Sequence, residues 1–141
     1  MKYVLDASVA VKWVIAEPDS AIALRLRDSA RAGQDELIAP EFFLVECGHA
    51  VFRLARRKLL SGPDANRCLV AILADCPSLF PFLGLVPRAS ILCQSASIGF
   101  YDALYIALAE QEGCQLVTAD IKLVANIGSA FPFIIPISSV P

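Results

Sequence analysis

Short apolar runs alternate with longer amphipathic segments along this 141-residue chain. The short runs are bounded by polar or turn-forming residues, which is typical of buried strands. The predicted strands are residues 2–5, 36–40, 79–86, 114–119 and 133–137, of which 79–86 is interrupted by Pro81 and belongs near a sheet edge. The longer segments have helical spacing, and the predicted helices are residues 8–17, 20–33, 40–60, 63–75, 88–97 and 101–112.

Polar and turn-forming residues set the expected helix ends. We expect Ser8 to cap the first helix, Pro40 to lie in the first turn of the long helix, and Pro63 to open the one after it. Strands that alternate with helices predict an α/β fold, a three-layer α/β/α sandwich around a central, mostly parallel sheet. A chain of this length is expected to form one domain, residues 1–141.

Composition limits the partners that the chain can have. The formal charge of −2 and the pI of about 5.3 give no overall basic excess of the kind that binds nucleic acid, so a polyanion would need a local patch or a bound cation. Hydrophobic residues make up 57% of the chain and the mean hydropathy is +0.62. We therefore expect a homodimer, a protein partner, or both.

The cysteines and the N-terminus indicate a compartment. Five cysteines, an odd number without a CxxC pair, favour reduced thiols over a disulfide framework or a zinc site. No apolar run approaches the roughly 18 residues of a membrane span, and Asp6 comes too early for a secretory signal. We expect a cytoplasmic protein that does not enter a membrane.

Two acids follow predicted strands. Asp6 comes directly after "KYVL" and Asp120 directly after "CQLVTA". Parallel sheets place their functional groups beyond the carboxyl ends of strands, so both acids are candidates for chemistry. The structural alternatives are that Asp6 caps the following helix and that Asp120 forms a turn.

Two further acids lie on predicted helices. Asp102 lies near the start of the mostly apolar segment "IGFYDALYIALAE", where the simplest alternative is a helix cap. The neighbours of Glu46 one helical turn away are Phe42, Phe43, His49 and Ala50, and all of them except His49 are apolar. Glu46 is therefore expected to face the interior, where a carboxylate needs a positive partner or a raised pKa.

Brought together, these four acids would repel one another strongly. A divalent cation would relieve this repulsion, and a site made only of oxygen ligands suits Mg²⁺ or Mn²⁺ better than zinc. We therefore expect a cation held by Asp6, Glu46, Asp102 and Asp120.

Four segments in order, "VLDASVAVKW", "APEFFLVECGHAV", "FYDALYIALAE" and "LVTADIKL", resemble the successive motifs of the PIN-domain family, and of its VapC-type toxins in particular. The resemblance implies a PIN-like fold and a ribonuclease with an antitoxin partner that blocks the cleft and brings DNA-binding ability to the complex. It also implies that Asp6, Glu46, Asp102 and Asp120 are the catalytic, metal-holding acids, with Ser8 and Thr118 in supporting positions.

His49 departs from the family pattern, which often has Asn three residues after the glutamate. A general base is one interpretation, and a polar group hydrogen-bonded near the site is the one we favour. Glu46-x-x-His49 also has di-iron spacing, but that chemistry needs a second such motif and this chain has a single His. No Ser is evident that this His would activate for serine-hydrolase chemistry.

A basic cluster ends the long helix: Arg53, Arg56, Arg57 and Lys58. It is a candidate track for substrate phosphates, although favourable contact with the helix dipole explains it as well. Lys12 and Lys122 are weaker candidates for the same role.

The predicted reaction is hydrolysis of a phosphodiester by water activated on the bound Mg²⁺, and the resemblance implies an RNA substrate. One alternative is a protein-interaction module that mainly binds an antitoxin. Another is a phosphatase of the haloacid-dehalogenase type, which expects a second acid at position 8, where this chain has Ser8.

Overall fold

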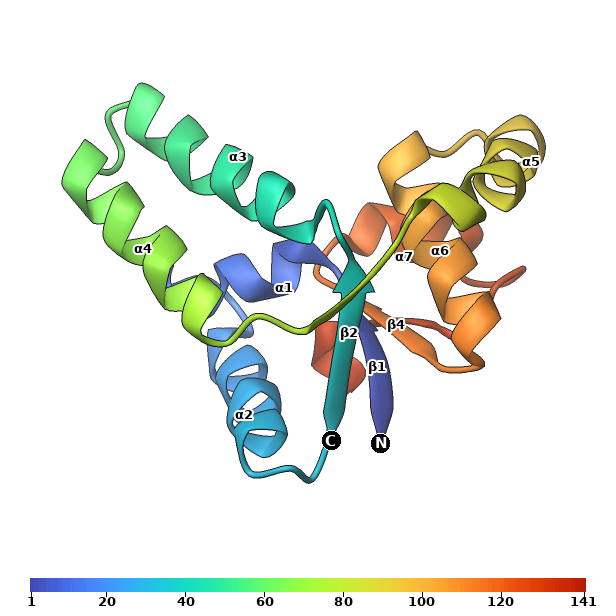
Figure 1. Ribbon diagram of the computed structural model, residues 1–141, viewed down its shortest axis with the longest axis horizontal. Coiled ribbons are helices and arrows are strands. Elements are labelled where there is room, and N and C mark those ends of the chain that lie inside the picture. Colours follow the sequence, from blue (N-terminus) through green and yellow to red (C-terminus); the bar gives the residue numbers. More distant parts are fainter.

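A computed structural model describes all residues, 1–141. Its centre is a five-stranded sheet in the order β3-β2-β1-β4-β5, in which every neighbouring pair is parallel (Figure 1). The strands are β1 (Lys2–Leu5), β2 (Glu36–Pro40), β3 (Ser78–Phe80), β4 (Gln115–Thr118) and β5 (Ile134–Pro136). The parallel sheet predicted from the alternating pattern is confirmed.

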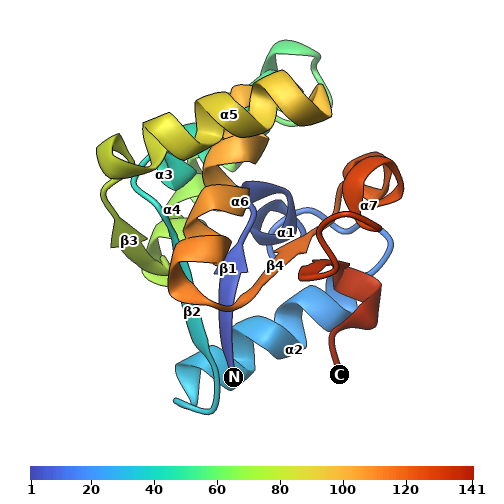
Figure 2. The same cartoon turned by 90° about the vertical axis from the view of Figure 1, so that its right-hand side faces the viewer.

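Helices cover both faces of the sheet, as predicted. They are α1 (Ala7–Val11), α2 (Ser20–Arg31), α3 (Phe43–Arg56), α4 (Gly62–Ala74), α5 (Val86–Ala96), α6 (Phe100–Glu112) and α7 (Ile121–Ile127), with 3-10 turns at Leu83–Leu85 and Ile137–Ser139. Helices α1 to α4 lie on one side of the sheet and α5 to α7 on the other (Figures 1 and 2). This division follows from right-handed crossovers, because the chain moves outward from β1 through β2 to β3 and then returns to β4.

The core is one cluster of 34 buried residues, contributed by the sheet and by the helices on both of its sides. Helix α6 is its most deeply buried helix, with every residue from 103 to 109 inaccessible to solvent. It packs against β1, β2 and β4, so its first turn is fixed above the carboxyl ends of those strands. The fold thereby sets the position of residue 102 relative to residues 6 and 120.

The first helix is shorter than predicted, and Asp6 rather than Ser8 is its N-cap. Helix α1 ends at Val11, not at residue 17, because the chain turns to place Trp13 in the core. The Trp13 indole N–H donates to the Ala23 carbonyl oxygen at 3.0 Å. Lys12 Nζ then bonds the Pro18 carbonyl oxygen at 2.8 Å, which closes the turn.

Two predictions around prolines were wrong. Pro40 is the last residue of β2, paired with Phe80, and α3 begins only at Phe43. Pro40 is tolerated because it ends its strand, where no further ladder bond from its nitrogen is needed. The run from residue 79 to 86 is a strand only as far as Phe80, since Pro81 ends β3 at the sheet edge and helical turns follow from Leu83.

Helix α7 was not predicted. It is only seven residues long, and an exposed Ile121 at its start obscures the amphipathic pattern. The signal that could have revealed it is the spacing of Leu123, Val124 and Ile127 directly after a capping Asp120.

All five cysteines are free, in agreement with the sequence prediction. No single helix is long and apolar enough to cross a membrane, and the segments Leu83–Ala96 and Phe100–Glu112 meet those criteria only jointly, across a bend of 118°.

Candidate active site

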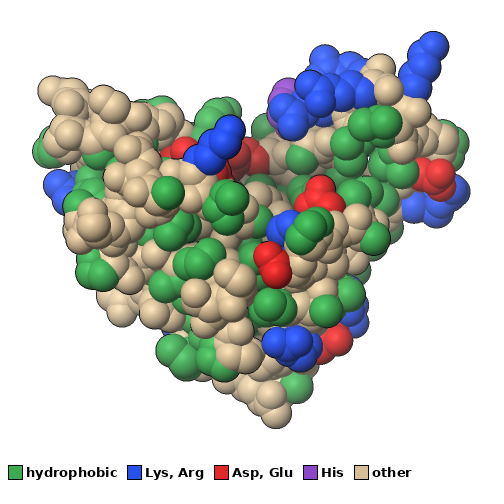
Figure 3. Space-filling model, turned by 180° about the vertical axis from the view of Figure 1, so that it is seen from behind, with side chains coloured by type: hydrophobic (Ala, Val, Ile, Leu, Met, Phe, Trp, Pro, Cys, Tyr) green, Lys and Arg blue, Asp and Glu red, His purple; other side chains and the backbone are tan.

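A cleft of about 570 Å³ opens at the carboxyl edge of the sheet, between α3 and the first turn of α6. Figure 3 shows it as a hollow between two lobes, with acidic side chains in its floor and Lys and Arg side chains beside the histidine on one lobe. All four predicted acids line this cleft: Asp6, Glu46, Asp102 and Asp120. They come from four separate segments, which the sheet topology brings together. The cleft lies where β1 and β4 are neighbours and their connections lead in opposite directions, the usual ligand position in such sheets.

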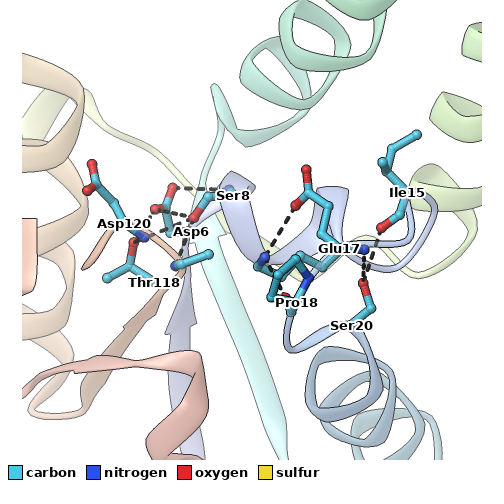
Figure 4. Close-up of polar contacts among 10 residues, drawn as sticks. Asp6, Ser8, Ile15, Glu17, Pro18, Ser20, Thr118 and Asp120 are labelled. Atoms are coloured by element: carbon cyan, nitrogen blue, oxygen red, sulfur yellow. Dashed lines mark hydrogen bonds and ion pairs between the residues drawn. The ribbon is translucent and has the colours of Figure 1, made fainter. Parts of the chain in front are cut away.

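Two hydroxyl groups hold Asp6 in place at the end of β1 (Figure 4). Thr118 Oγ1 donates to Asp6 Oδ2 at 2.6 Å, and Ser8 Oγ donates to the same oxygen at 2.7 Å. Each hydroxyl also accepts one backbone N–H, Thr118 from Asp120 and Ser8 from Ala119, both at 3.0 Å. Ser8 and Thr118 therefore support the site by fixing the carboxylate and the loop after β4 together.

Burial raises the pKa of Asp6, with a smaller contribution from the charge of Asp120, while the bonds from Thr118 and Ser8 oppose the rise. Asp6 Oδ1 accepts only a long bond of 3.4 Å from the Ser8 N–H, so this oxygen has capacity for a ligand. The capping alternative for Asp6 is thus correct, and it is compatible with a place in the cleft.

Asp120 also combines two roles. Its Oδ1 accepts from the Lys122 and Leu123 N–H groups at 2.9 and 3.1 Å, which caps α7. Its other oxygen makes no hydrogen bond within the protein, and the side chain is exposed to the cleft. The predicted turn is therefore a helix N-terminus that leaves one carboxylate oxygen free.

Asp102 lies in the first turn of α6, but its carboxylate makes no hydrogen bond, and the N-cap residue is Gly99. A hydrogen-bonded cap is therefore not the explanation for this acid. Burial raises its pKa to about 6, and the charges of Asp6 and Asp120 add to the rise. Asp102 is thus held near two other carboxylates, and only the N-terminal end of the α6 dipole favours its charge, since no side-chain hydrogen bond or ion pair does.

Glu46 lies in the first turn of α3 and lines the cleft. Burial raises its pKa to about 7, the neighbouring Tyr105 hydroxyl opposes the rise, and the charges of Asp6 and Asp102 add to it. Its Oε1 is buried without a hydrogen-bond partner. The expected positive partner is absent, since no lysine or arginine forms an ion pair with Glu46.

The chemistry of this donor set fits a hard divalent cation. The cleft offers carboxylate oxygens from four segments, including one buried oxygen without a partner and two acids whose ionised forms are disfavoured by burial and by the charges of their neighbours. No three of these side chains converge closely enough to form a complete ligand set as they stand. A cation would therefore draw the carboxylates inward from these positions.

The basic residues divide into two groups. His49 and Arg53 line the cleft one and two turns along α3 from Glu46, whereas Arg56, Arg57 and Lys58 lie beyond its rim. All five side chains are exposed, and none of the four cations forms an ion pair.

His49 makes no side-chain hydrogen bond, so the expectation of a hydrogen-bonded polar group was wrong. Lys12 bonds Glu17 and Pro18 at 3.2 and 2.8 Å outside the cleft (Figure 4), which removes it from the phosphate track. Lys122 is exposed but does not line the cleft.

Two tyrosines of α6 were not predicted: Tyr101 lines the cleft, and Tyr105 is buried beside it. Tyr105 lies three residues after Asp102 on α6, is only 1% exposed, and its hydroxyl is buried without a hydrogen-bond partner. The signal was present in "DALYIALA", where one hydroxyl interrupts an otherwise apolar stretch.

Comparison with known proteins adds family relationships to this geometry. The family model described as "PIN domain" matches residues 3–127. The chain is 33% identical over 113 residues to Ribonuclease VapC9 of Mycobacterium tuberculosis, covering 78% of this chain and 87% of that protein.

Two solved structures have the same fold. PAE2754 from Pyrobaculum aerophilum superimposes with a TM-score of 0.71 at 22% identity, covering 99% of this chain and 94% of the other. VapBC2 from Rickettsia felis, bound to a DNA fragment from their promoter, gives 0.65 at 20% identity, covering 96% and 97%. With the sequence match across most of its length, the chain belongs to the PIN domain family and is related to the VapC ribonucleases.

Proposed function

We propose that this protein is a divalent-cation-dependent endoribonuclease that acts as the toxin of a toxin–antitoxin pair. The observation that carries the proposal is the meeting of Asp6, Glu46, Asp102 and Asp120 in one cleft, where none of the four forms an ion pair with a lysine or arginine. The relationship to proteins named as ribonucleases supports RNA as the substrate.

The four carboxylates would hold Mg²⁺ or Mn²⁺. When bound, such an ion lowers the pKa of water for attack on the phosphodiester and neutralises charge on the phosphate. Ser8 and Thr118 keep Asp6 oriented by donating to one of its oxygens. Asp120 offers the oxygen that does not cap α7.

Arg53 is the cation best placed to bind a phosphate of the substrate. It lines the cleft two turns along α3 from Glu46, and Arg56 and Arg57 continue the basic surface toward the end of that helix. None of the three is engaged by an acid, so their charges are available to a polyanion. A local patch of this kind compensates for the net charge of −2.

Incubation of the purified protein with total RNA, followed by mapping of new ends, tests the proposal directly. We expect cleavage with Mg²⁺ or Mn²⁺, and none with excess chelator. We also expect none from Asp102→Asn at any Mg²⁺ concentration. Cleavage that persists in chelator, or in purified Asp102→Asn protein, would refute the metal-dependent assignment.

We further propose an antitoxin partner, and assembly of the toxin as a homodimer. Five apolar side chains on the α3–α4 hairpin are 41 to 71% exposed: Val45, Phe52, Leu59, Val70 and Leu73. An exposed apolar surface of this kind is typical of an interaction site. The free cysteines suit a reducing compartment, which supports the cytoplasm as the place of action.

An interaction module without catalysis remains the second candidate, favoured by the same exposed apolar residues. Such a module has no need for four carboxylates in one cleft. Binding of a partner, together with no cleavage of RNA either with or without added Mg²⁺ or Mn²⁺ in the test above, would favour the interaction module over the nuclease.

A further inference from the structure

Two side-chain polar atoms in the whole protein are buried without a hydrogen-bond partner; one belongs to a residue that lines the candidate active site and the other to a residue buried beside it. They are Glu46 Oε1 and the Tyr105 hydroxyl oxygen. A buried polar group that makes no hydrogen bond destabilises a fold, so such groups are few in native proteins and call for an explanation. Two of them side by side, one able to donate and one able to accept, share a single explanation.

The two groups are neighbours across the cleft wall. The Phe42 ring packs against the Tyr105 ring, and the Phe42 carbonyl oxygen accepts the Glu46 N–H at 3.0 Å one turn along the helix, so the Tyr105 and Glu46 side chains lie close together, although their polar atoms do not meet hydrogen-bond geometry as they stand. Tyr105 comes from α6, one turn after Asp102, and Glu46 comes from the first turn of α3. The pair therefore links the two helices that form the walls of the cleft.

Packing fixes the position of the Tyr105 ring. Phe42, the residue before α3, lies edge-on to the Tyr105 ring with centroids 5.3 Å apart and the planes at 84°. The Tyr105 side chain is 1% exposed, whereas Glu46 is only half-buried and lines the open cleft. The tyrosine is thus the fixed member of the pair and the glutamate the mobile one.

We propose that Tyr105 is a positioning residue that donates its phenolic hydrogen to Glu46 Oε1 when the glutamate turns to bind the cation. The bond would satisfy both buried atoms and leave Oε2 for the ion. This inference rests on the proposed metal-dependent function. Partners of metal ligands typically change metal affinity or activity by about 10- to 100-fold when they are removed.

The test is titration calorimetry with Mn²⁺ on purified wild type, Tyr105→Phe and Tyr3→Phe. Tyr3 is the matched control, since it is also buried but its hydroxyl donates to the Met1 sulfur at the far end of β1. We expect Tyr105→Phe to bind Mn²⁺ at least tenfold more weakly and Tyr3→Phe to bind it as wild type does. In RNA cleavage, Tyr105→Phe should need about tenfold more Mg²⁺ for half-maximal rate.

Thermal unfolding of the metal-free proteins separates this role from simple packing. Tyr105→Phe removes an unpaired hydroxyl and should melt no lower than wild type, whereas Tyr3→Phe loses a bonded hydroxyl and should not gain stability. Unchanged Mn²⁺ affinity in Tyr105→Phe, or a clearly lower melting temperature, would overturn the inference while leaving the proposed function intact. Absence of Mn²⁺ binding by wild type would overturn both.

Discussion

The carboxylates at the strand ends and those on the helices line one cleft, but the protein supports them differently. Asp6 and Asp120 accept hydrogen bonds from hydroxyls or backbone N–H groups and cap α1 and α7. Glu46 and Asp102 accept none, and burial raises their pKa values to about 7 and about 6. Asp6 and Asp120 therefore take part in hydrogen bonds that hold the fold together, even though burial raises the pKa of Asp6 as well. Glu46 and Asp102 make no such bonds and cost stability in the absence of a cation.

This difference gives each pair a distinct signature. Removing charge from the helical pair should abolish function while stabilising the metal-free protein, as expected where residues are retained for activity at the expense of stability. Removing charge from the strand-end pair should damage both properties.

The largest expected effect is loss of cleavage in Asp102→Asn and Asp6→Asn. Each removes a carboxylate from the proposed cation site, so initial rates with RNA at fixed Mg²⁺ should fall by at least about 100-fold. Their stabilities should diverge. Asp102→Asn should unfold at a higher temperature than wild type at pH 8, because an unsupported buried charge is gone. Asp6→Asn should lose about 1 kcal/mol, because the amide nitrogen cannot accept from the Ser8 N–H and a neutral amide oxygen accepts more weakly than a carboxylate from the Ser8 and Thr118 hydroxyls.

Glu41→Gln is the control for both variants, because Glu41 is an exposed acid outside the cleft. It should leave rate and stability unchanged. Equal stability changes in Asp6→Asn and Asp102→Asn would erase the distinction between the two pairs.

A smaller effect is expected in the pH dependence of stability. Because the folded-state pKa values of Glu46 and Asp102 lie above their ordinary values, the folded protein binds more protons than the unfolded chain between about pH 4 and 7. These two groups therefore stabilise the fold at low pH, and that contribution is lost as the pH rises to 7. With allowance for solvent screening of these partly exposed groups, we expect a loss of about 1–2 kcal/mol in total.

Denaturant unfolding at pH 5 and pH 8, in chelator, measures this contribution. The double variant Glu46→Gln/Asp102→Asn should lack it, so the comparison with wild type isolates these two groups from other titrating residues. Saturating Mg²⁺ should reduce the loss in wild type and leave the double variant unaffected. If the free energy of unfolding changed between pH 5 and pH 8 by the same amount in wild type and in the double variant, the fold would not raise the pKa values of these two acids.

The smallest expected effect concerns the basic surface. Arg53→Gln should weaken binding of RNA to the cleavage-inactive Asp102→Asn protein and reduce the slope of log affinity against log salt by about one. Arg88→Gln is the matched control, since Arg88 already pairs with Glu110 at 2.7 Å. If the slope of log affinity against log salt were the same in the Arg53→Gln and Arg88→Gln variants, Arg53 would not bind RNA phosphate, and its contact with the helix dipole would explain its position.

The strand-end acids could be predicted from the sequence because one rule covers both. Apolar strands that alternate with helices imply parallel pairing, and parallel strands bring residues after their carboxyl ends to one edge. Asp6 and Asp120 follow adjacent strands, so their meeting required only the strand order. Glu46 could be recognised from its apolar neighbours, although its solvent-exposed side reaches the cleft rather than the core.

Features set by tertiary contacts could not be predicted in the same way. The early end of α1 depends on a bond between Trp13 and Ala23, and a local pattern contains no information about that contact. The sequence around Tyr105 is typical of a core helix. The proposed role of the Tyr105 hydroxyl depends on Glu46, which lies on another helix. His49 lines the cleft without any partner, which its place on α3 alone did not indicate.

The most direct test of the central claim is to locate Mn²⁺ by anomalous diffraction from crystals of the protein grown or soaked with the ion. We expect a peak in the cleft, bonded to carboxylate oxygens that include Asp6. We also expect Glu46 to have turned toward the ion. A cleft without Mn²⁺ at saturating concentration, or an ion bound elsewhere with the four acids left as they are, would contradict it.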